Sequence, residues 1–239
     1  MAQLTWDNTA EHLYETGVSK GVLYVYDAKT KKYGKGVAWN GLISVSESPS
    51  GAEETALYAD NKKYLSLMSV EEFGATINAY TYPNAFKPCV GEEDIVDGVS
   101  YGQQAHAKFA FCYQTKVGSA EDNNLGYKIH IVYGALAAAS EKEYSTVNDS
   151  PEAMEMSWEI TTTPVKVADG KYTSCITVDS TKFTTEDAKG KLATLESKLY
   201  GSNGTGEQND GATEPTLVMP DELATIFASA ASGEEQAAE

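Results

Sequence analysis

The sequence predicts a mainly β protein: an antiparallel β-sandwich or barrel with one flanking α-helix, an extended loop and terminal arms. Short runs rich in Val, Ile, Thr and aromatic residues recur along the chain, and Gly, Pro, Asn and Asp separate them. Such runs are typical of antiparallel strands. Helical patterns do not alternate with these runs, as they would in a protein built on a parallel sheet.

The alternation of apolar and polar residues locates the strands. In the segment FGATINAYTYP, Ala75, Ile77 and Ala79 fall on one face of a strand, and polar residues fall on the other. A strand with one apolar and one polar face indicates a sheet with the core on one side and water on the other. In chain order, the predicted strands lie at 21–28, 37–45, 61–73, 73–83, 108–117, 127–138, 156–165 and 173–181.

One segment, TTEDAKGKLATLESKLYG, predicts a helix at 184–200. Thr184 can cap its N-terminus, and two acidic residues follow in the first turn, where the helix dipole favours negative charge. Gly201 suits the C-terminal cap. The apolar stripe of this helix must be buried, most simply on one face of the sheet. It consists of Ala188, Leu192, Leu195 and Leu199.

The chain divides into four parts by composition. An N-terminal arm is expected at 1–20, a β-sandwich body with its helix at 21–200, and a flexible linker at 201–215. The remaining residues, 216–239, are expected to form a C-terminal arm with a short helix and a disordered tail. This apolar arm needs a partner surface, either on its own body or on a neighbouring subunit. Its apolar residues are Leu217, Val218, Met219, Leu223, Ile226 and Phe227.

The formal net charge of −17 limits the possible partners. Such an acidic surface repels phosphate, which argues against sequence-specific nucleic-acid binding but not against a conduit that lets DNA pass. The three widely spaced cysteines are typical of reduced thiols in a cytosol. No apolar run is long enough to span a membrane, and the first residues lack the pattern of a signal peptide, so no membrane partner is expected.

The sequence contains no motif that indicates catalysis or metal binding. The three histidines lack the spacing of a zinc site, and the glycines do not form a nucleotide-binding loop. No GxSxG or similar elbow places a nucleophile beside a base. EDNNLG resembles a fragment of a calcium loop, but it lies between predicted strands and fits a hairpin turn better. A non-enzymatic protein without cofactor or metal is therefore expected.

Several segments resemble one protein family when read in chain order. They are the stretch AWNGLISVSESPSGAEETALYADNKKYLSLMSVEEFGATINAYTYP, then GQQ, GYKIHIVYG and EKEYSTVNDSPEAMEMSWEITTTPV. Together they are similar to the phi13-type major tail proteins, the tail tube proteins of long-tailed bacteriophages. The resemblance extends from about residue 36 to the helix that ends near residue 200. The region beyond Gly201 carries no part of it.

The resemblance implies a tail-tube-like fold and a structural role in the virion. Such subunits assemble into hexameric rings, and the rings stack into a hollow tube through which the genome passes without specific binding. The implied partners are other copies of the chain, the tape-measure protein, and the tail-tip and terminator proteins. The implied location is the tail of the virion, after synthesis in the cytoplasm of the host bacterium.

The resemblance also gives a role to the long acidic join SESPSGAEETALYAD. In tail tube proteins, a long loop between early strands reaches a neighbouring subunit, and we expect 47–60 to be that loop. Its candidate interface residues are Glu47, Ser48, Pro49, Ser50, Gly51, Glu53, Glu54, Leu57 and Tyr58. Residues 48–51 would make the turn, the acidic pair would meet Lys62 or Lys63 of another copy, and the two apolar residues would be buried in the neighbour.

Two alternatives stay open. The join can be an ordinary long surface hairpin without a partner. The protein can also be a carbohydrate-binding or adhesin β-sandwich, because 15 tyrosines and 3 tryptophans could supply exposed rings that stack on sugars.

Overall fold

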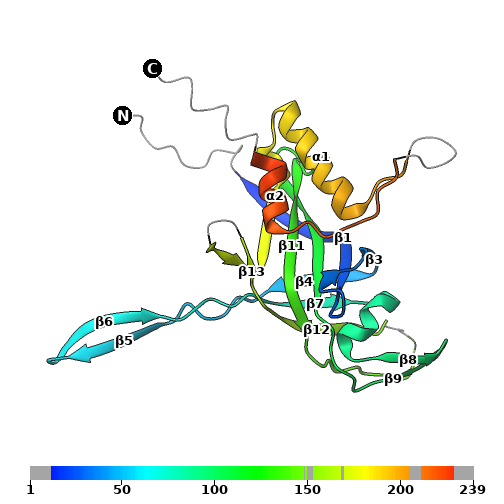
Figure 1. Cartoon of the computed structure of the whole chain (residues 1–239), viewed down its shortest axis with the longest axis horizontal. Helices are drawn as coiled ribbons and strands as arrows, with labels where there is room; N and C mark the ends of the chain where they lie inside the picture. Colours follow the sequence, from blue (N-terminus) through cyan, green and yellow to red (C-terminus); the bar gives the residue numbers. More distant parts are fainter. Residues whose placement is uncertain (1–11, 148, 150–152, 168–169, 205–210, 229–239) are drawn as a thin grey trace.

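The computed structural model describes residues 12–147, 149, 153–167, 170–204 and 211–228 (Figure 1). Residues 1–11 of the expected N-terminal arm and residues 229–239, which include the expected disordered tail GEEQAAE, lie outside the described residues. The strands are β1 (Leu13–Asp27), β2 (Lys32–Tyr33), β3 (Val37–Trp39), β4 (Leu42–Glu47), β5 (Glu54–Ala59), β6 (Lys62–Met68), β7 (Gly74–Ala79), β8 (Glu93–Val96), β9 (Val99–Tyr101), β10 (Phe109–Ser119), β11 (Gly126–Ala137), β12 (Met156–Thr162), β13 (Val165–Lys166), β14 (Tyr172–Thr173) and β15 (Cys175–Asp179). The helices are α1 (Glu186–Tyr200) and α2 (Pro220–Phe227), with 3₁₀ segments η2 (Asn84–Val90) and η4 (Ser180–Lys182).

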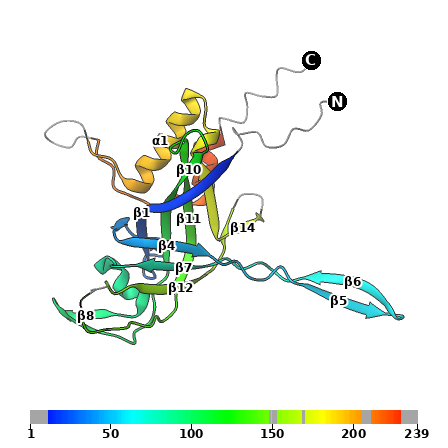
Figure 2. The ribbon, with the colours of Figure 1, turned by 180° about the vertical axis from the view of Figure 1, so that it is seen from behind.

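The main sheet has the strand order β2-β1-β10-β11-β12-β7-β4, and the described pairs are antiparallel. In addition, β3 pairs with β1, and β15 pairs with β11. The sheet bends sharply, so that β4, β7 and β12 cross the long strands β10 and β11 (Figure 2). The antiparallel, mainly β fold class predicted from the sequence is therefore confirmed.

The bend occurs where β11 changes partner. β11 pairs with β15 as far as Val132 and with β12 from Ala135 onward. Gly134 lies between these two stretches with a φ of 59°, and its carbonyl accepts a hydrogen bond of 2.9 Å from the Thr163 N–H. A Cβ atom at this position would lie 2.3 Å from the Thr163 carbonyl oxygen, so the bend requires glycine.

The first core fills the space inside the bend. It is aromatic at its centre, where the rings of Trp39, Phe86 and Trp158 meet with centroid distances of 4.5 to 5.7 Å. The Trp39 Nε1–H donates to the Thr81 carbonyl at 2.8 Å, which satisfies its polar atom. The face predicted for the segment 73–83 is confirmed here, because Ala75, Ile77 and Ala79 are buried in this core.

The second core lies on the other side of β1, β10 and β11, beneath α1 and α2. The helix stripe predicted from the sequence contributes Leu192, Leu195 and Leu199 to this core. The cap is one residue later than predicted, because Thr185 rather than Thr184 accepts a hydrogen bond from the Ala188 N–H at 3.2 Å. The helix begins at Glu186, so Ala188 is its third residue. The backbone N–H at this position is one that an N-cap side chain accepts from.

Residues 13–20 differ from the sequence expectation. The sequence predicts an N-terminal arm here, but these residues form the first half of β1 and pair with β10 from Leu13 opposite Ser119. The register shifts twice, between Thr16 and Ser19 and between Ser19 and Val22. These bulges break the alternation of apolar and polar residues, which is the signal that sequence reasoning needs.

Candidate functional site

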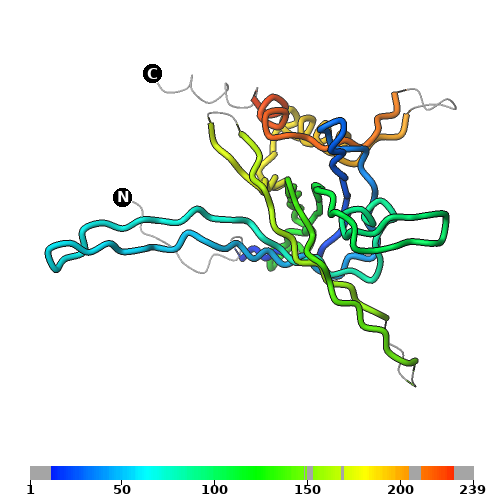
Figure 3. The backbone as a smooth tube through the Cα atoms, turned by 60° about the horizontal axis from the view of Figure 1, so that its bottom comes forward, coloured from blue at the N-terminus to red at the C-terminus, as the bar shows by residue number. Residues whose placement is uncertain are grey.

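The candidate functional site is a long two-stranded arm, defined here as residues 48–72, which includes β5 and β6. The arm continues the β4–β7 pair outward from the body, as Figures 1 and 3 show. The Ser48 N–H donates to the Gly74 carbonyl at 2.8 Å, and Ser50 and Glu72 exchange two hydrogen bonds of 2.8 Å. Further out, Leu57 pairs with Leu65. The join expected as a loop is therefore a ribbon whose base is in register with the sheet.

The turn of the arm is not where the sequence placed it. Asp60 and Asn61 make the turn, with φ values of 50° and 59°, and they connect β5 to β6 as a two-residue hairpin. The expected turn at 48–51 is instead an irregular part of the ribbon. Gly51 has a φ of 89°, and a Cβ atom there would lie 2.2 Å from the Val70 carbonyl oxygen. The Ser–Pro–Ser–Gly composition, which usually marks a turn, here marks a close approach of two backbones.

The arm exposes apolar side chains along its whole length. The register places Leu57, Leu65 and Leu67 on one face, because Leu57 is opposite Leu65 and Thr55 is opposite Leu67. The side chains of Tyr58 and Val70 are 74% and 82% exposed. No residue of the arm belongs to either of the two cores described above. These side chains are available to a partner, as expected for Leu57 and Tyr58, but their burial in a neighbour stays a prediction.

The opposite face of the arm carries an ion pair. The Lys63 ammonium and the Ser66 hydroxyl both donate to the Glu54 carboxylate. In the single chain, the lysine partner of Glu54 thus lies in the same arm, and the expected contact of Glu54 with a lysine of another copy stays a prediction. The hydrogen bond from Lys63 lowers the pKa of Glu54, and the bond from Ser66 lowers it further. The Glu53 N–H donates to the Ser69 hydroxyl at 2.9 Å.

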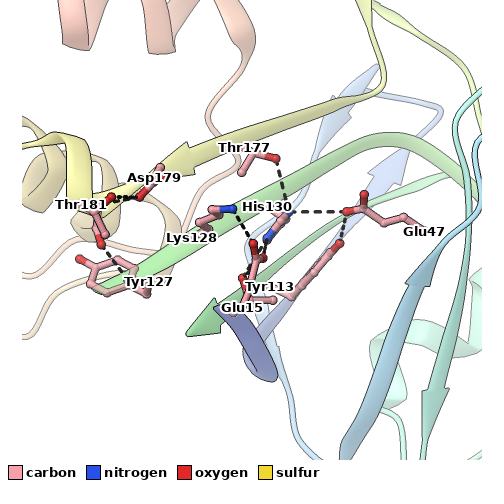
Figure 4. A network of polar contacts seen from close by, with 11 residues as sticks. Glu15, Glu47, Tyr113, Tyr127, Lys128, His130, Thr177, Asp179 and Thr181 are labelled. Atoms are coloured by element: carbon pink, nitrogen blue, oxygen red, sulfur yellow. Dashed lines mark hydrogen bonds and ion pairs between the residues drawn. The ribbon is translucent and has the colours of Figure 1, made fainter. Parts of the chain in front are cut away.

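A polar cluster holds the base of the arm (Figure 4). Tyr113 Oη donates to Glu47 Oε1 at 2.5 Å, and the Tyr113 ring stacks on the His130 ring with centroids 4.7 Å apart. The two nitrogens of His130 face two carboxylates, with Nε2 at 3.2 Å from Glu15 and Nδ1 at 3.5 Å from Glu47. Lys128 also donates to Glu15. The cluster thus joins β1, β4, β10 and β11 where the arm leaves the body.

The electrostatics of this cluster favour an ionised Glu15 and a protonated Tyr113. Burial by itself raises the pKa of Glu15, but hydrogen bonds from Lys128 and Thr115 outweigh it and hold this pKa below its usual value. Burial raises the pKa of Tyr113, and the bond to Glu47 raises it further. Sequence reasoning missed the cluster, because Glu47 and Tyr113 are 66 residues apart. The one signal for this cluster in the sequence was His130, which lies between Ile129 and Ile131 and therefore points to the opposite face of the strand from them.

A polar surface covers the outer face of β4, β7 and β12. Residues that alternate with the buried ones point away from the first core. Their side chains are mostly hydroxyls and amides, and Asn78 Nδ2 donates to Ser44 Oγ at 2.9 Å. We call this surface the polar wall. It consists of Ser44, Ser46, Thr76, Asn78, Ser157, Glu159 and Thr161.

The C-terminal candidate residues lie against the chain's own body. Val218 and Leu223 are buried in the second core, and the four others of the set, Leu217, Met219, Ile226 and Phe227, pack against it. Tyr133 Oη donates to the Val218 carbonyl at 2.8 Å, and Lys198 forms an ion pair with Glu222. The sequence left open whether the C-terminal segment packs on its own body or on a neighbouring subunit. In the structure it packs on its own body. A contact of these residues with a neighbouring subunit stays a prediction.

The part of the chain that the structure describes contains no cluster of three or more His, Cys, Asp or Glu side chains suited to a metal ion. Burial raises the pKa of Cys89, Cys112 and Cys175 to about 12, so these thiols are poor nucleophiles at neutral pH. Neither of the described α-helices is long and apolar enough to cross a membrane.

No family model matches this chain, and no curated protein matches it. Among solved structures, it is similar to a chain of the anti-feeding prophage baseplate, with 7% identity, 66% of this chain and 92% of that chain covered, and a TM-score of 0.34. It is also similar to a chain of the PVC sheath–tube complex of an extracellular contractile injection system, with 10% identity, coverage of 67% and 88%, and a TM-score of 0.29. A third similar structure is Hcp1 from Salmonella typhimurium, with 12% identity, coverage of 67% and 95%, and a TM-score of 0.27.

Proposed function

We propose that this chain is the major tail tube subunit of a long-tailed bacteriophage, which forms stacked hexameric rings around a channel for DNA. The sequence resemblance between residues 36 and 200 supports the family and the six-fold ring. On this proposal the protein is structural, carries out no catalysis and needs no cofactor. Its location is the tail of the virion, after synthesis in the cytoplasm of the host bacterium.

The exposed arm is the observation that carries the proposal. An isolated two-stranded ribbon is only marginally stable in water, and a row of exposed Leu and Tyr side chains on it favours association. Burial of one such side chain contributes about 1.5–3 kcal/mol. Leu57, Leu65 and Leu67 lie far from both cores of their own chain, so a second copy is the simplest surface to cover them.

The polar wall is the part of the surface that fits the lining of a channel. Its uncharged hydroxyl and amide groups stay hydrated without attracting phosphate. Among its seven residues, Glu159 carries the one formal charge, and a hexamer would repeat that negative charge six times around the channel. With a net charge of −17 on each chain, such a wall lets DNA slide without binding it.

The proposal also includes partners of the assembled tube. The tape-measure protein would occupy the channel before DNA does, and the tail-tip and terminator proteins would close the two ends. These partners follow from the family resemblance. β4 is the last strand in the order of the main sheet, and backbone groups on its outer edge have no described strand partner and can pair with a neighbouring strand.

Negative-stain electron microscopy of the purified full chain, at increasing concentration, tests the proposal, with the mass measured by light scattering. Six subunits of 25.7 kDa give about 154 kDa for one ring. We expect rings with a central hole, and tubes at high concentration or after tail-tip proteins are added as an initiator. A particle that stays monomeric both with and without the initiator contradicts the proposal.

The carbohydrate-binding alternative is not favoured by a specific observation. Trp39 and Trp158 are buried in the first core, where they cannot stack on a sugar. The four most exposed tyrosines of the described residues do not form one platform: Tyr58 and Tyr64 lie on the arm, and Tyr144 and Tyr172 lie on two other segments of the chain. Binding of the monomer to a glycan array, at a site that Tyr58→Ala removes, would revive this alternative.

A further inference from the structure

A groove with a volume of about 800 Å³ is lined by residues 143–145 and 153–155 and by Tyr80, the residue after β7. Its walls include two exposed tyrosine rings, Tyr80 and Tyr144, and two carboxylates, Glu143 and Glu155. Among the residues that the structure describes, none forms a hydrogen bond or an ion pair with either carboxylate. Aromatic faces beside unpaired carboxylates are groups that bind a cationic side chain. We call this surface the acidic groove.

The chain uses the same combination of groups next to the groove. The Lys142 ammonium donates to Glu92 at 2.7 Å and lies 5.6 Å from the centre of the Tyr82 ring. Tyr80 is two residues before Tyr82, and Glu143 follows Lys142 directly. This part of the chain thus already binds one lysine between a carboxylate and a tyrosine ring. The acidic groove presents the same chemistry to a lysine from elsewhere.

Lysines are concentrated at one turn of the chain. The ten residues 27–36, which include β2, contain four of the 18 basic residues and one acidic residue. We call this segment the basic turn. Lys35 forms an ion pair with Glu214 at 2.6 Å. The other three lysines are exposed and form no ion pair within the described part of the chain; they are Lys29, Lys31 and Lys32.

The segment that carries the acidic groove has the opposite charge balance. Residues 141–155 contain five acidic residues and one lysine. That lysine is Lys142, whose charge is already paired with Glu92. The charges of the basic turn and of the acidic groove are therefore complementary when every charged residue of both segments is counted.

The two surfaces lie on opposite sides of the body. The Gly36 N–H donates to the Pro215 carbonyl at 2.9 Å, so the basic turn lies beside the segment that leads to α2. In Figure 3, the two helices lie on one side of the molecule, and the segment that contains the acidic groove projects away from them. The basic turn and the acidic groove of one chain therefore face different neighbours.

We propose that the basic turn of one copy of this chain docks in the acidic groove of a second copy. The inference rests on the proposed function and names a contact between its subunits. Two different surfaces on opposite sides of each copy make a head-to-tail contact, which can repeat from subunit to subunit. Since each chain has a net charge of −17, most other approaches of two copies bring like charges together. The local contact of opposite charges thus selects the partner surface and its orientation.

The basic turn is fixed before it binds. The Asp27 carboxylate accepts hydrogen bonds from the Lys29 N–H at 2.8 Å and from the Thr30 hydroxyl at 2.9 Å. The ring of Tyr33 packs edge-on against the ring of Tyr26, with the centroids 5.2 Å apart. A segment that is held in this way loses little conformational freedom on binding, which favours the contact.

A carbodiimide, which joins an ammonium directly to a carboxylate, tests the inference on the full chain. Unlabelled chain and chain labelled with heavy nitrogen are mixed at low concentration and then concentrated as for microscopy. Mass spectrometry then reads the isotopes of each cross-linked peptide pair. We expect lysines of the basic turn to be joined to Glu143 or Glu155 in pairs that contain both isotopes. The Lys142–Glu92 pair is the internal control, and its link should contain only one isotope.

Charge reversal provides the matched variants. Lys31→Glu with Lys32→Glu should reduce the mixed-isotope link about tenfold, because like charges then meet in the groove. When this variant is mixed with Glu143→Lys, Glu155→Lys chain, the link should return between the introduced carboxylates and the introduced lysines. The control is Lys166→Glu with Lys171→Glu, two exposed lysines of the β13–β14 hairpin, which should leave the link unchanged. Circular dichroism checks that each variant folds.

The outcomes separate this inference from the proposed function. Rings in the microscope without the mixed-isotope link overturn the inference and leave the tube. The link without rings supports the contact and contradicts the tube, and the absence of both overturns both. A link that contains only one isotope, or one from the groove to Lys166 or Lys171 of another copy instead, also overturns the inference.

Discussion

The Tyr113 hydroxyl donates a hydrogen bond of 2.5 Å to the Glu47 carboxylate, and this bond ties the body of the protein to the strand from which the arm extends. Tyr113 belongs to the first core through its ring, while Glu47 is the last residue of β4. This bond joins a buried residue to a partly exposed one at the base of the arm.

Tyr113→Phe should lower the free energy of unfolding by about 1 kcal/mol, because it removes the donor while water can still solvate Glu47. Urea denaturation measures the change. Tyr14→Phe is the control, since its hydroxyl bonds Asn123 Oδ1 at 2.8 Å in an exposed position and its loss should cost less than about 0.5 kcal/mol. If the two variants lose equal amounts of unfolding free energy, the Tyr113–Glu47 bond stabilises the fold no more than an exposed hydrogen bond does.

Glu15 should make the protein sensitive to acid. Its pKa is lowered in the folded state, so the unfolded state binds more protons between the folded and the unfolded pKa values. The stability that Glu15 contributes is therefore present above its unfolded pKa of about 4.3 and is lost as the pH falls through the folded value. The urea midpoint should fall less between pH 7 and pH 3 in Glu15→Gln than in the native protein. Glu53→Gln, on the exposed arm, is the control. If both variants reduce the fall of the urea midpoint with pH to the same extent, Glu15 is not the source of the acid sensitivity.

Gly134→Ala should destabilise the fold by about 1–3 kcal/mol, because alanine is strained at a positive φ and its Cβ would collide with the Thr163 carbonyl. Gly190→Ala is the matched control. Nothing lies within 4 Å of a Cβ at Gly190 in α1, so this change should stabilise the helix by about 0.5–1 kcal/mol. Thermal unfolding should give shifts of opposite sign, and shifts of the same sign would contradict this account of the bend in β11.

Leu223→Ala should cost about 2–4 kcal/mol, since the side chain of α2 is buried in the second core and a cavity would remain. Thr225→Ala in the same helix is exposed and should change stability by less than about 0.5 kcal/mol. If denaturation gives similar values for the two variants, the C-terminal segment does not pack on its own body in solution.

Removal of the arm should leave a folded monomer that forms no rings. Replacing residues 51–71 by Asn-Gly keeps the paired Ser50 and Glu72 and closes them with a two-residue turn. Because neither core contains a residue of this stretch, the melting temperature should change by only a few degrees. Circular dichroism checks the fold and electron microscopy checks the rings. Rings built from the shortened chain would exclude the arm as an assembly element.

The local patterns of the sequence were sufficient for most elements. Alternation located β7, β10, β11, β12 and β15, and the helix stripe with its acidic first turn located α1, because these signals depend only on neighbours along the chain. They failed where backbone irregularities disturb the period, as in the first half of β1. They also failed at the arm, where a stretch rich in Ser, Pro and Gly indicated a turn and the real turn at Asp60 and Asn61 lay ten residues further on.

The sequence by itself determined the fold class, the acidic surface and the presence of an apolar segment after the body, since each of these follows from composition and short-range pattern. Only the tertiary structure decided that this segment packs on its own chain, that Glu54 pairs with Lys63, and that Glu15, Glu47 and His130 meet at the base of the arm. The physical reason is that these contacts join residues whose separation along the chain carries no signal. The cluster at the base of the arm forms because the bend in β11 and the register of the strands bring its residues together. The Glu54–Lys63 pair forms because the two-residue turn at Asp60 and Asn61 places β5 beside β6.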